Sequence, residues 1–331
     1  MNVDIYNPYS NQNVTSYYVN IIEEALTSAG HSVQKISKIT YKNKNSTSAI
    51  LVVNVLDLIK ARIFRYKKVF LWAQGIIPEE SFVRNHSKFR FKILSLIEKF
   101  AISNSDFSFF VSNTQVEHYK EKYKISLENY MIMPCFNDEI KSYSFFKTDK
   151  YEKNIFVYAG NLQPWQCFRE TARLYKMIED AVDNSHFKVL VKDKDQAEAI
   201  LKEYAIKRYS IDFVPQDLLY EELSNAKFGF CLREDITVNN VATPTKLSSY
   251  ISNGIFPIYS KSIGDFSKIS KTSPYCFAVD VSLNVKSDIE NIIFACKKDI
   301  SAQCVFDSFT STFGEYYSRS HYIEKIIPHL R

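Results

Sequence analysis

Lys246 is the residue in this sequence whose position most clearly favours a bound anion. It falls in the stretch TPTKLSSYISNG, where Thr243 stands at an expected N-cap, Pro244 takes the first helical position and Gly254 closes the helix. A lysine in a first turn opposes the helix dipole unless an anion offsets it. With the free N–H groups of Thr245 and Lys246, this side chain is predicted to cradle a diphosphate. The alternative is a solvated lysine on an ordinary short helix.

Gly160 is a second candidate for the same chemistry. It ends the apolar run of residues 155–159 and precedes a polar turn and a predicted helix. Glycine lets the backbone turn tightly and a ligand approach closely, and a helix N-terminus favours anions. A purely structural turn would explain the same glycine. Arg233 ends another apolar run, residues 228–232, and brings a second positive charge into a loop that also contains Asn239.

Both residues follow predicted strands, and those strands belong to a pattern that repeats along the chain. Short β-rich runs alternate with longer amphipathic stretches, as in βαβ units with parallel sheets. The predicted strands are residues 3–6, 32–36, 50–55, 69–72, 107–112, 130–133, 155–159, 188–191, 211–214, 228–232, 255–258 and 275–279. The sequence therefore predicts an α/β protein with two Rossmann-like domains.

The division between the domains is predicted in the polar segment SFFKTDKYEKN, residues 144–154. We expect an amino-terminal domain of residues 1–148 and a carboxyl-terminal domain of residues 149–312. A helical segment at about 313–331 is expected to pack back on the first domain. Parallel sheets bind ligands at the carboxyl ends of their strands, so two facing domains would enclose a cleft.

The composition restricts the class of protein. Of the 331 residues 46% are hydrophobic and 24% charged, as in soluble globular proteins, and the net charge of +5 is only mildly basic. No nucleic-acid-reading motif is present, so we expect no nucleic-acid partner. The six cysteines form no CxxC pair and are expected to be buried free thiols of a reducing cytoplasm. A signal peptide and an uncharged apolar run of about 18 residues are both absent, which favours a cytoplasmic protein.

Five stretches carry a family resemblance over nearly the whole chain. They are WAQGIIPEE (72–80), SDFSFFVSNTQVEHY (105–119), MPCFND (133–138), VYAGNLQPWQ (157–166) and REDITVNNVATPTKLSSYISNG (233–254). Together they resemble the retaining glycosyltransferases of the two-domain GT-B fold, close to family 4. The resemblance is to bacterial members that build capsule, O-antigen (lipopolysaccharide) or other surface polysaccharides, and the last two stretches are the most specific.

The resemblance implies transfer of a sugar from a nucleotide diphosphate, with a UDP-sugar as the expected donor. The acceptor would be a saccharide or a lipid-linked saccharide. Gly160 and Asn161 would lie beside the donor diphosphate, and Arg233 and Lys246 would neutralise it. Asn239 would hold its loop or touch the sugar. The nucleotide sugar is a co-substrate, and no cofactor is expected.

Further donor-side positions follow from the same resemblance, with two departures. Val214 and Pro215 fall where the family's chain passes the nucleotide base. Asn161 and Gln166 take the places of an arginine and a lysine in the wider family. Ser249 stands where a glutamate holds donor hydroxyls, so it keeps a hydrogen bond but brings no charge.

Ser249 keeps other functions open. The chief rival to an enzyme is a catalytically silent GT-B subunit that binds and supports an active partner glycosyltransferase. A third possibility is a related enzyme with another task on the same donors, such as an epimerase.

On the acceptor side, the resemblance points to the loop after the predicted strand at 69–72. Its candidates for a place near the reacting carbon are Gln74, Gly75 and Glu79 or Glu80. A helix-start loop with solvent-facing acids is the alternative. His118 is a candidate base, although a histidine in the middle of a helix is more often a surface residue. Asn11, in NPYSNQNVTSYY, is expected to meet a sugar acceptor.

No metal site is expected. A DxD pair at a strand end is absent, and the sequence Asp193-Lys194-Asp195 opens a charged, helix-like stretch that favours a solvated turn. The two basic residues Arg233 and Lys246 would supply the charge instead, which predicts metal-independent transfer.

Residues 81–100, SFVRNHSKFRFKILSLIEKF, combine five Lys or Arg residues with a single Glu and interleaved apolar side chains. Such a basic amphipathic helix can lie on an anionic membrane, which would bring the protein to the inner face of that membrane. The alternative is an ordinary helix packed on the first domain with its basic side in water.

Overall fold

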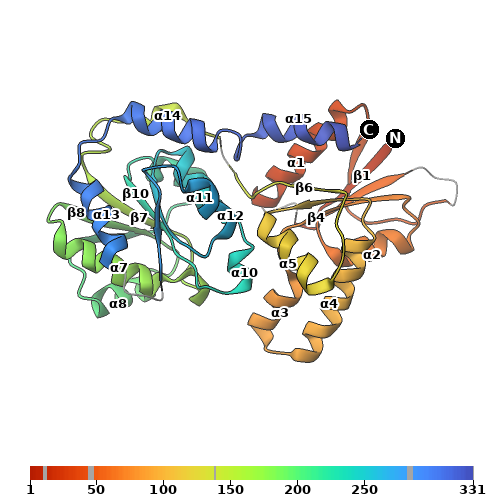
Figure 1. Cartoon of the computed structure of the whole chain (residues 1–331), viewed down its shortest axis with the longest axis horizontal. Coiled ribbons are helices and arrows are strands. Elements are labelled where there is room, and N and C mark those ends of the chain that lie inside the picture. The colour runs from red at the N-terminus through yellow and green to blue at the C-terminus, as the bar shows by residue number, and fades with distance from the viewer. Residues whose placement is uncertain (10–12, 44–47, 138, 282–285, 331) are drawn as a thin grey trace. The chain divides into compact units, whose positions relative to one another are not determined.

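The structure is a computed structural model that describes residues 1–9, 13–43, 48–137, 139–281 and 286–330. The chain forms two compact units, and neither is one continuous stretch. Unit 1 comprises Met1–Asn137, Val241–Thr243 and Ser318–Arg331, and unit 2 comprises Asp138–Asn240 and Pro244–Tyr317. Figure 1 shows a twisted sheet flanked by helices in each unit.

Unit 1 is built on a parallel sheet of six strands in the order β2-β1-β3-β4-β5-β6. Its strands are β1 (Asn2–Tyr6), β2 (Ser32–Ile36), β3 (Ala49–Val52), β4 (Lys68–Ala73), β5 (Phe107–Phe110) and β6 (Tyr130–Ile132). Its helices are α1 (Asn13–Ser28), α2 (Val55–Ile63), α3 (Ile77–Asn85), α4 (Lys88–Ser103), α5 (Asn113–Tyr123) and α15 (Arg319–Leu330). Helix α15 packs along α1, as Figure 1 shows.

Unit 2 repeats this plan with a parallel sheet in the order β12-β11-β10-β7-β8-β9. Its strands are β7 (Asn154–Ala159), β8 (Ser185–Leu190), β9 (Tyr209–Asp212), β10 (Phe228–Cys231), β11 (Phe256–Ser260) and β12 (Phe277–Val279). Its helices are α6 (Ser142–Phe145), α7 (Phe168–Ala181), α8 (Lys194–Glu203), α9 (Gln216–Leu223), α10 (Thr237–Asn240), α11 (Thr245–Ser252), α12 (Gly264–Ser270), α13 (Lys286–Lys297) and α14 (Ala302–Phe313).

The strands lie where the apolar runs predicted them. Every residue of β3, β5 and β10 is buried, because helices cover both faces of a parallel sheet. The core of unit 2 is aromatic: the rings of Phe156 and Phe228 stack with centroids 4.5 Å apart. All twelve predicted strands are present, and the α/β class with two domains is confirmed.

The polar segment at 144–154 is not the connection that we expected. It belongs to unit 2, where Ser144 and Phe145 are buried in α6. The ammonium group of Lys150 is buried and donates to the carbonyls of Ser144 and Asn253, and the hydroxyl of Tyr151 donates to the carbonyl of Gly254. The segment looks polar in sequence, but its polar groups satisfy carbonyls inside the unit.

The single basic helix expected at 81–100 is in fact two helices. His86 takes a left-handed conformation with φ 52°, which ends α3. The hydroxyl of Ser87 then accepts a hydrogen bond from the N–H of Arg90 and caps α4. In the described part of the chain no helix is long and apolar enough to cross a bilayer.

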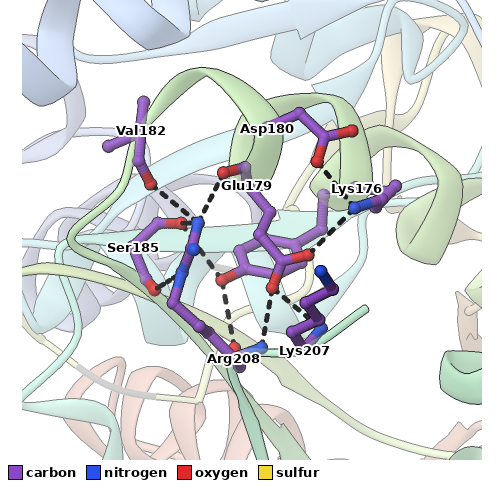
Figure 2. A network of polar contacts seen from close by, with 8 residues as sticks. Lys176, Glu179, Asp180, Val182, Ser185, Lys207 and Arg208 are labelled. Carbon is purple, nitrogen blue, oxygen red and sulfur yellow. Dashed lines mark hydrogen bonds and ion pairs between the residues drawn. The ribbon is translucent and has the colours of Figure 1, made fainter. Parts of the chain in front are cut away.

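Arg208 joins three elements of unit 2, as Figure 2 shows. Its guanidinium donates to the carbonyls of Glu179 and Val182 at the end of α7 and to the carbonyl of Ser185 at the start of β8. The carboxylate of Glu179 accepts hydrogen bonds from the backbone N–H groups of Lys207 and Arg208, at 3.0 and 2.7 Å. An arginine at a helix end satisfies the last carbonyls, so this network fixes α7 against the sheet.

We expect Arg208→Met to lower the free energy of unfolding by about 2–4 kcal/mol, because the carbonyls of Glu179, Val182 and Ser185 lose the donor that satisfies them. Urea unfolding of the full chain measures the change. Arg169→Met is the control, because Arg169 is exposed and its charged partner, Glu203, is exposed as well. Equal effects of the two substitutions would show that the network does not stabilise unit 2.

Candidate functional site

Two of the predicted site residues flank the point where the strand order of unit 2 reverses. The chain runs from β7 outward to β8 and β9, and then returns to place β10 on the other side of β7. Gly160 follows β7 directly, and Arg233 follows β10 after one intervening residue. Parallel α/β sheets bind ligands at such a switch point, at the carboxyl ends of the strands. Unit 2 therefore places both residues at the edge where a ligand is expected.

Lys246 reaches the same place from helix α11. Its Nζ atom donates to the side-chain oxygen of Gln166 at 2.9 Å and lies 4.4 Å from the ring centre of Tyr158. Gly160 has φ +154°, and a Cβ atom built on it would lie 2.5 Å from the Nζ atom of Lys246. The backbone conformation thus favours glycine at this position, and a larger residue would displace the ammonium end of Lys246.

Helix α11 is fixed on the sheet one turn after Lys246. The ring of Tyr250 lies against Gly229, where an added Cβ would be 2.7 Å from ring atoms, and its hydroxyl donates to the carbonyl of Phe230 at 3.0 Å. Residues four apart share one face of a helix, so Tyr250 holds Lys246 toward the edge of the sheet. Gly254 has φ +67° and follows the helix end, as predicted.

The start of α11 differs from the prediction by one residue. The helix begins at Thr245, and Pro244 is the residue that precedes it, without a side-chain cap. The hydroxyl oxygen of Thr243 instead accepts a hydrogen bond from the N–H of Cys135, at 2.8 Å within unit 1. Lys246 still lies in the first turn, where the first N–H groups lack intrahelical partners.

Two basic side chains, those of Arg233 and Lys246, lie close enough at this edge to repel each other. Burial and the neighbouring charge of Arg233 lower the pKa of Lys246 to about 7. Arg233 is buried. Its backbone N–H donates to the hydroxyl of Ser260 at 2.7 Å, and that hydroxyl donates to the carbonyl of Arg233 at 2.8 Å. Within the described residues, neither Arg233 nor Lys246 forms an ion pair with a carboxylate. Two adjacent cations without a carboxylate favour a bound anion.

The other predicted donor-side residues lie on the loops of the same sheet edge. Asn161 is exposed beside Gly160, and its side chain accepts a hydrogen bond from the N–H of Gln163 at 3.2 Å. Asn239 is buried and donates to the carbonyl of Glu234 at 2.9 Å, so it holds the loop after β10. Thr245 is the first residue of α11.

Val214, Pro215 and Ser249 are also on this side of unit 2. Val214 and Pro215 follow β9 and lead into α9. Ser249 is half-buried on α11, one turn after Thr245.

The loop from Gly160 to α7 separates two cavities of unit 2. One of about 420 Å³ is lined by Arg233, Glu234 and Ser260 among others. The other, of about 430 Å³, is lined by Gln163, Phe168 and Gln196 among others. Pro164 of this loop lines both cavities, so there is space for a ligand on either side of the loop.

In unit 1 the predicted acceptor-side loop is held from helix α5. The carbonyl of Gly75 accepts hydrogen bonds from the side chains of Gln115, at 3.1 Å, and Tyr119, at 2.9 Å, both buried. Gln115 also donates to the carbonyl of Ala73 at 3.3 Å. These bonds fix the backbone after β4, and Gln74 between them is exposed.

Glu79 and His118 are brought together in unit 1, where both side chains are half-buried. The carboxylate of Glu79 lies 3.1 Å from His118 and 2.7 Å from the ammonium of Lys122. Burial would raise the pKa of Glu79, but the hydrogen bonds from His118 and Lys122 outweigh it and lower the pKa. His118 is therefore half-buried and paired with Glu79, and not the fully solvated histidine that its place in the middle of a helix favoured.

Glu98 completes this network. It is fully buried, and burial raises its pKa to about 7. It accepts hydrogen bonds from the N–H of Ile77, at 2.9 Å, and the hydroxyl of Tyr123, at 2.7 Å. Lys122 lies between Glu79 and Glu98. This geometry favours a role for Glu79 in holding the start of α3.

Glu80, the second acid of the loop, lies elsewhere. Its carboxylate is next to the backbone of Gly75, and an added Cβ on Gly75 would meet it at 2.1 Å. Burial raises the pKa of Glu80. Asn11 lies outside the described residues.

No group of three or more histidine, cysteine or acidic side chains in the described part of the chain is arranged to hold a metal ion. Asp193 of the DKD sequence is an N-cap: its carboxylate accepts a hydrogen bond from the N–H of Gln196 at 3.2 Å. Lys194 pairs with Asp212 at 2.9 Å.

Three contacts of the predicted residues were not predicted from the sequence, because each joins elements that are remote in sequence. In unit 2, Lys246 lies over the ring of Tyr158, and Arg233 is bonded to Ser260. In unit 1, Gly75 accepts a hydrogen bond from Gln115. For a fourth contact, that of Lys246 with Gln166, the sequence contained a partial signal, because Gln166 stands where the family that the sequence resembles carries a lysine.

Comparison with known proteins shows the fold. No family model and no curated protein sequence matches this chain. Solved structures do match, among them sucrose-phosphate synthase from Thermosynechococcus elongatus, with TM-score 0.71, 11% identity and coverage of 98% of this chain and 97% of that one. The lipopolysaccharide outer core galactosyltransferase WaaB matches with TM-score 0.68, 11% identity and coverage of 100% and 99%. HepE from Anabaena, solved with UDP and glucose, matches with TM-score 0.66, 8% identity and coverage of 99% and 98%. The chain thus has the two-domain fold of the GT-B glycosyltransferases.

Proposed function

We propose that this protein is a glycosyltransferase that takes a sugar from a nucleotide diphosphate, with a UDP-sugar as the donor. The observation that carries this proposal is the cationic edge of unit 2. Lys246 and Arg233 converge at the strand-order switch beside Gly160 with no carboxylate partner in the described residues. The shared fold supports the same function, and HepE was solved with UDP and glucose.

In the proposed reaction, the bond between the sugar and the diphosphate breaks, and the oxygen of an acceptor hydroxyl bonds to the sugar carbon on the same face while its proton passes to the leaving diphosphate. The leaving diphosphate gathers negative charge as this bond breaks. Preorganised donors aimed at that charge stabilise the transition state, and in this proposal Lys246, Arg233 and the N-terminus of α11 supply them. We propose that the transfer proceeds with retention and without a metal ion. Activity lost with EDTA and restored by Mn²⁺ would contradict the second point.

The acceptor in this proposal is a saccharide or a lipid-linked saccharide of a bacterial surface polysaccharide, such as capsule or lipopolysaccharide. The protein would then work in the cytoplasm or at the inner face of the membrane. On the acceptor side we propose Gln74 and Glu80 as the polar groups nearest the acceptor, because Gln74 is exposed and Glu80 lies against Gly75. Glu79 and His118 would position that loop.

A thermal-shift panel of nucleotide sugars tests the proposal. One donor should raise the melting temperature selectively, since binding at a hundredfold excess over Kd stabilises a protein by about 2.7 kcal/mol. That donor should then be consumed when a suitable acceptor is present. Failure of every nucleotide sugar to bind would overturn the assignment.

Ser249 favours the second candidate, a silent GT-B subunit that supports an active partner. A silent subunit would be stabilised by a nucleotide but would release no nucleotide diphosphate from the donor. Ser249→Glu distinguishes the two further, because it should tighten donor binding in an enzyme whose ribose contact is weakened.

Donor affinity is expected to fall as the pH rises, because Lys246 has a pKa lowered to about 7 in the free protein. The ammonium form is the one that attracts a diphosphate. Above about pH 7 binding must therefore take up a proton, and affinity should fall by up to about tenfold per pH unit. Isothermal titration of the nucleoside diphosphate from about pH 7 to about pH 9 measures this slope, in a range where the phosphates, with a pKa of about 6, stay ionised.

Lys246→Met is the control for this pH dependence, because it removes the titrating group and keeps an apolar stem. The variant should bind more weakly and with a flat pH profile. A wild-type affinity that is constant over the same range, with no heat that depends on the buffer, would contradict the expectation.

A further inference from the structure

Helix α4 carries an exposed apolar stripe. Phe89, Ile93, Leu96 and Phe100 are 76, 42, 71 and 48% exposed. Their spacing is i, i+4, i+7 and i+11, so at about 100° per residue they fall within an arc of about 60°. Single exposed apolar side chains are ordinary, but four in one row on one helix form a patch of the kind found at interaction sites.

The stripe is separate from the packing of α4 within unit 1. The buried residues of the helix, Glu98, Ala101 and Ile102, centre on the opposite side. Of the apolar residues at 81–100, Phe82 and Phe91 contact each other with ring centres 5.8 Å apart, and so fill the space between α3 and α4. Figure 1 shows α3 and α4 as a pair that extends away from the sheet of unit 1.

Basic residues border the stripe. Lys88, Lys92 and Lys99 are exposed and lie along one flank within about 40° of each other, and Arg90 is exposed on the other. None of the four pairs with a carboxylate in the described residues. The one carboxylate within residues 81–100 is that of Glu98, which is fully buried. The exposed surface of α4 is therefore apolar with a positive border.

We propose that this surface of α4, formed by the apolar stripe and its basic border, docks on anionic lipid headgroups at a membrane surface. The apolar side chains enter the boundary between headgroups and acyl chains, and the lysines keep their ammonium groups at the phosphates. A second copy of the chain fits this surface less well, because a two-fold contact would bring the same lysines against each other. The inference goes beyond the proposed chemistry, since it concerns a surface and not a substrate.

Vesicle co-sedimentation of the full chain tests it. The protein should bind vesicles of phosphatidylcholine with about 30% phosphatidylglycerol, bind phosphatidylcholine alone far less, and release as salt is added. Phe89→Ser with Leu96→Ser should lower the partition coefficient at least about tenfold. Lys88→Gln with Lys92→Gln and Lys99→Gln should remove the preference for anionic lipid.

The matched control is Phe294→Ser on helix α13 of unit 2, where an equally apolar ring is 66% exposed. It should leave vesicle binding unchanged. All the substituted side chains are exposed, and unchanged circular dichroism and thermal unfolding verify that each variant is folded. The test needs no sugar, so its outcome is independent of the proposed reaction.

Three results would overturn the proposal. The first is wild-type protein that ignores anionic vesicles. The second is vesicle binding that the α4 variants and the Phe294 variant reduce equally. The third is a dimer in solution that Leu96→Ser dissociates, because the stripe would then be covered by a second copy.

Discussion

Lys246→Ala is expected to lower sugar transfer by about 10²–10³-fold while the protein stays folded. The reason for the first effect is the loss of one preorganised cation at the leaving diphosphate. The reason for the second is that Lys246 is half-buried beside Arg233 without a carboxylate partner in the described residues, so removing its charge relieves repulsion. The release of nucleotide diphosphate measures transfer, and the melting temperature should be unchanged or higher.

Lys192→Ala is the control for this result, because Lys192 is an exposed lysine just after β8 on the same unit. It should leave transfer nearly unchanged. Arg233→Ala should resemble Lys246→Ala, and the double variant should lose less than the two losses combined, since the cations act on one charge. Full turnover by Lys246→Ala would remove the main physical support for the proposed function.

Gly160→Ala is expected to have the second-largest effect, a loss of transfer of about 10²-fold. The new Cβ would lie 2.5 Å from the Nζ atom and 2.8 Å from the Cε atom of Lys246, so the lysine must leave Gln166. A side-chain end can move at little cost to folding, but the cation is then displaced from the site. Donor affinity by titration and turnover by product release should both fall.

Gly30→Ala separates this displacement from backbone strain. Gly30 has φ +83°, yet an added Cβ would meet nothing within 4 Å. It should cost about 1–2 kcal/mol of stability and leave transfer per folded molecule intact. Equal losses of transfer at the two glycines would mean that Gly160 acts through strain alone.

Local pattern was sufficient to predict the sheets but not the contacts that assemble the site. Strand β10 could be predicted because its apolar run is continuous and ends at a charged loop. The pairing of Lys246 with Gln166 could not, because it joins residues 80 positions apart. The start of α11 was misplaced for the same reason: the Thr243 hydroxyl bonds to the N–H of Cys135, 108 positions away, and not to its own helix.

The buried faces and the ends of helices were the other features that the sequence did not predict. Gln115 and Tyr119 lie one turn apart on α5 in a stretch rich in charged residues, which is typical of a surface helix. Only the packed unit shows that this face is buried against the backbone of Gly75. Ser87 is a residue type typical of an N-cap and could have indicated that α4 begins there. The basic and apolar pattern continues across it, however, and this favoured a single helix.

Unit 1 is assembled from segments at both ends of the chain, and this has a consequence for folding during synthesis. Helix α15, which packs on α1 and pairs Arg319 with Glu24, is translated only after all of unit 2. The ribosome therefore releases β1 to β6 long before the segment that covers α1 exists, and unit 2 can close first. Until then the face of α1 that receives Arg319, at Tyr17 and Glu24, is open to chaperones. Premature termination before Ser318 would leave an intact unit 2 beside an unfinished unit 1.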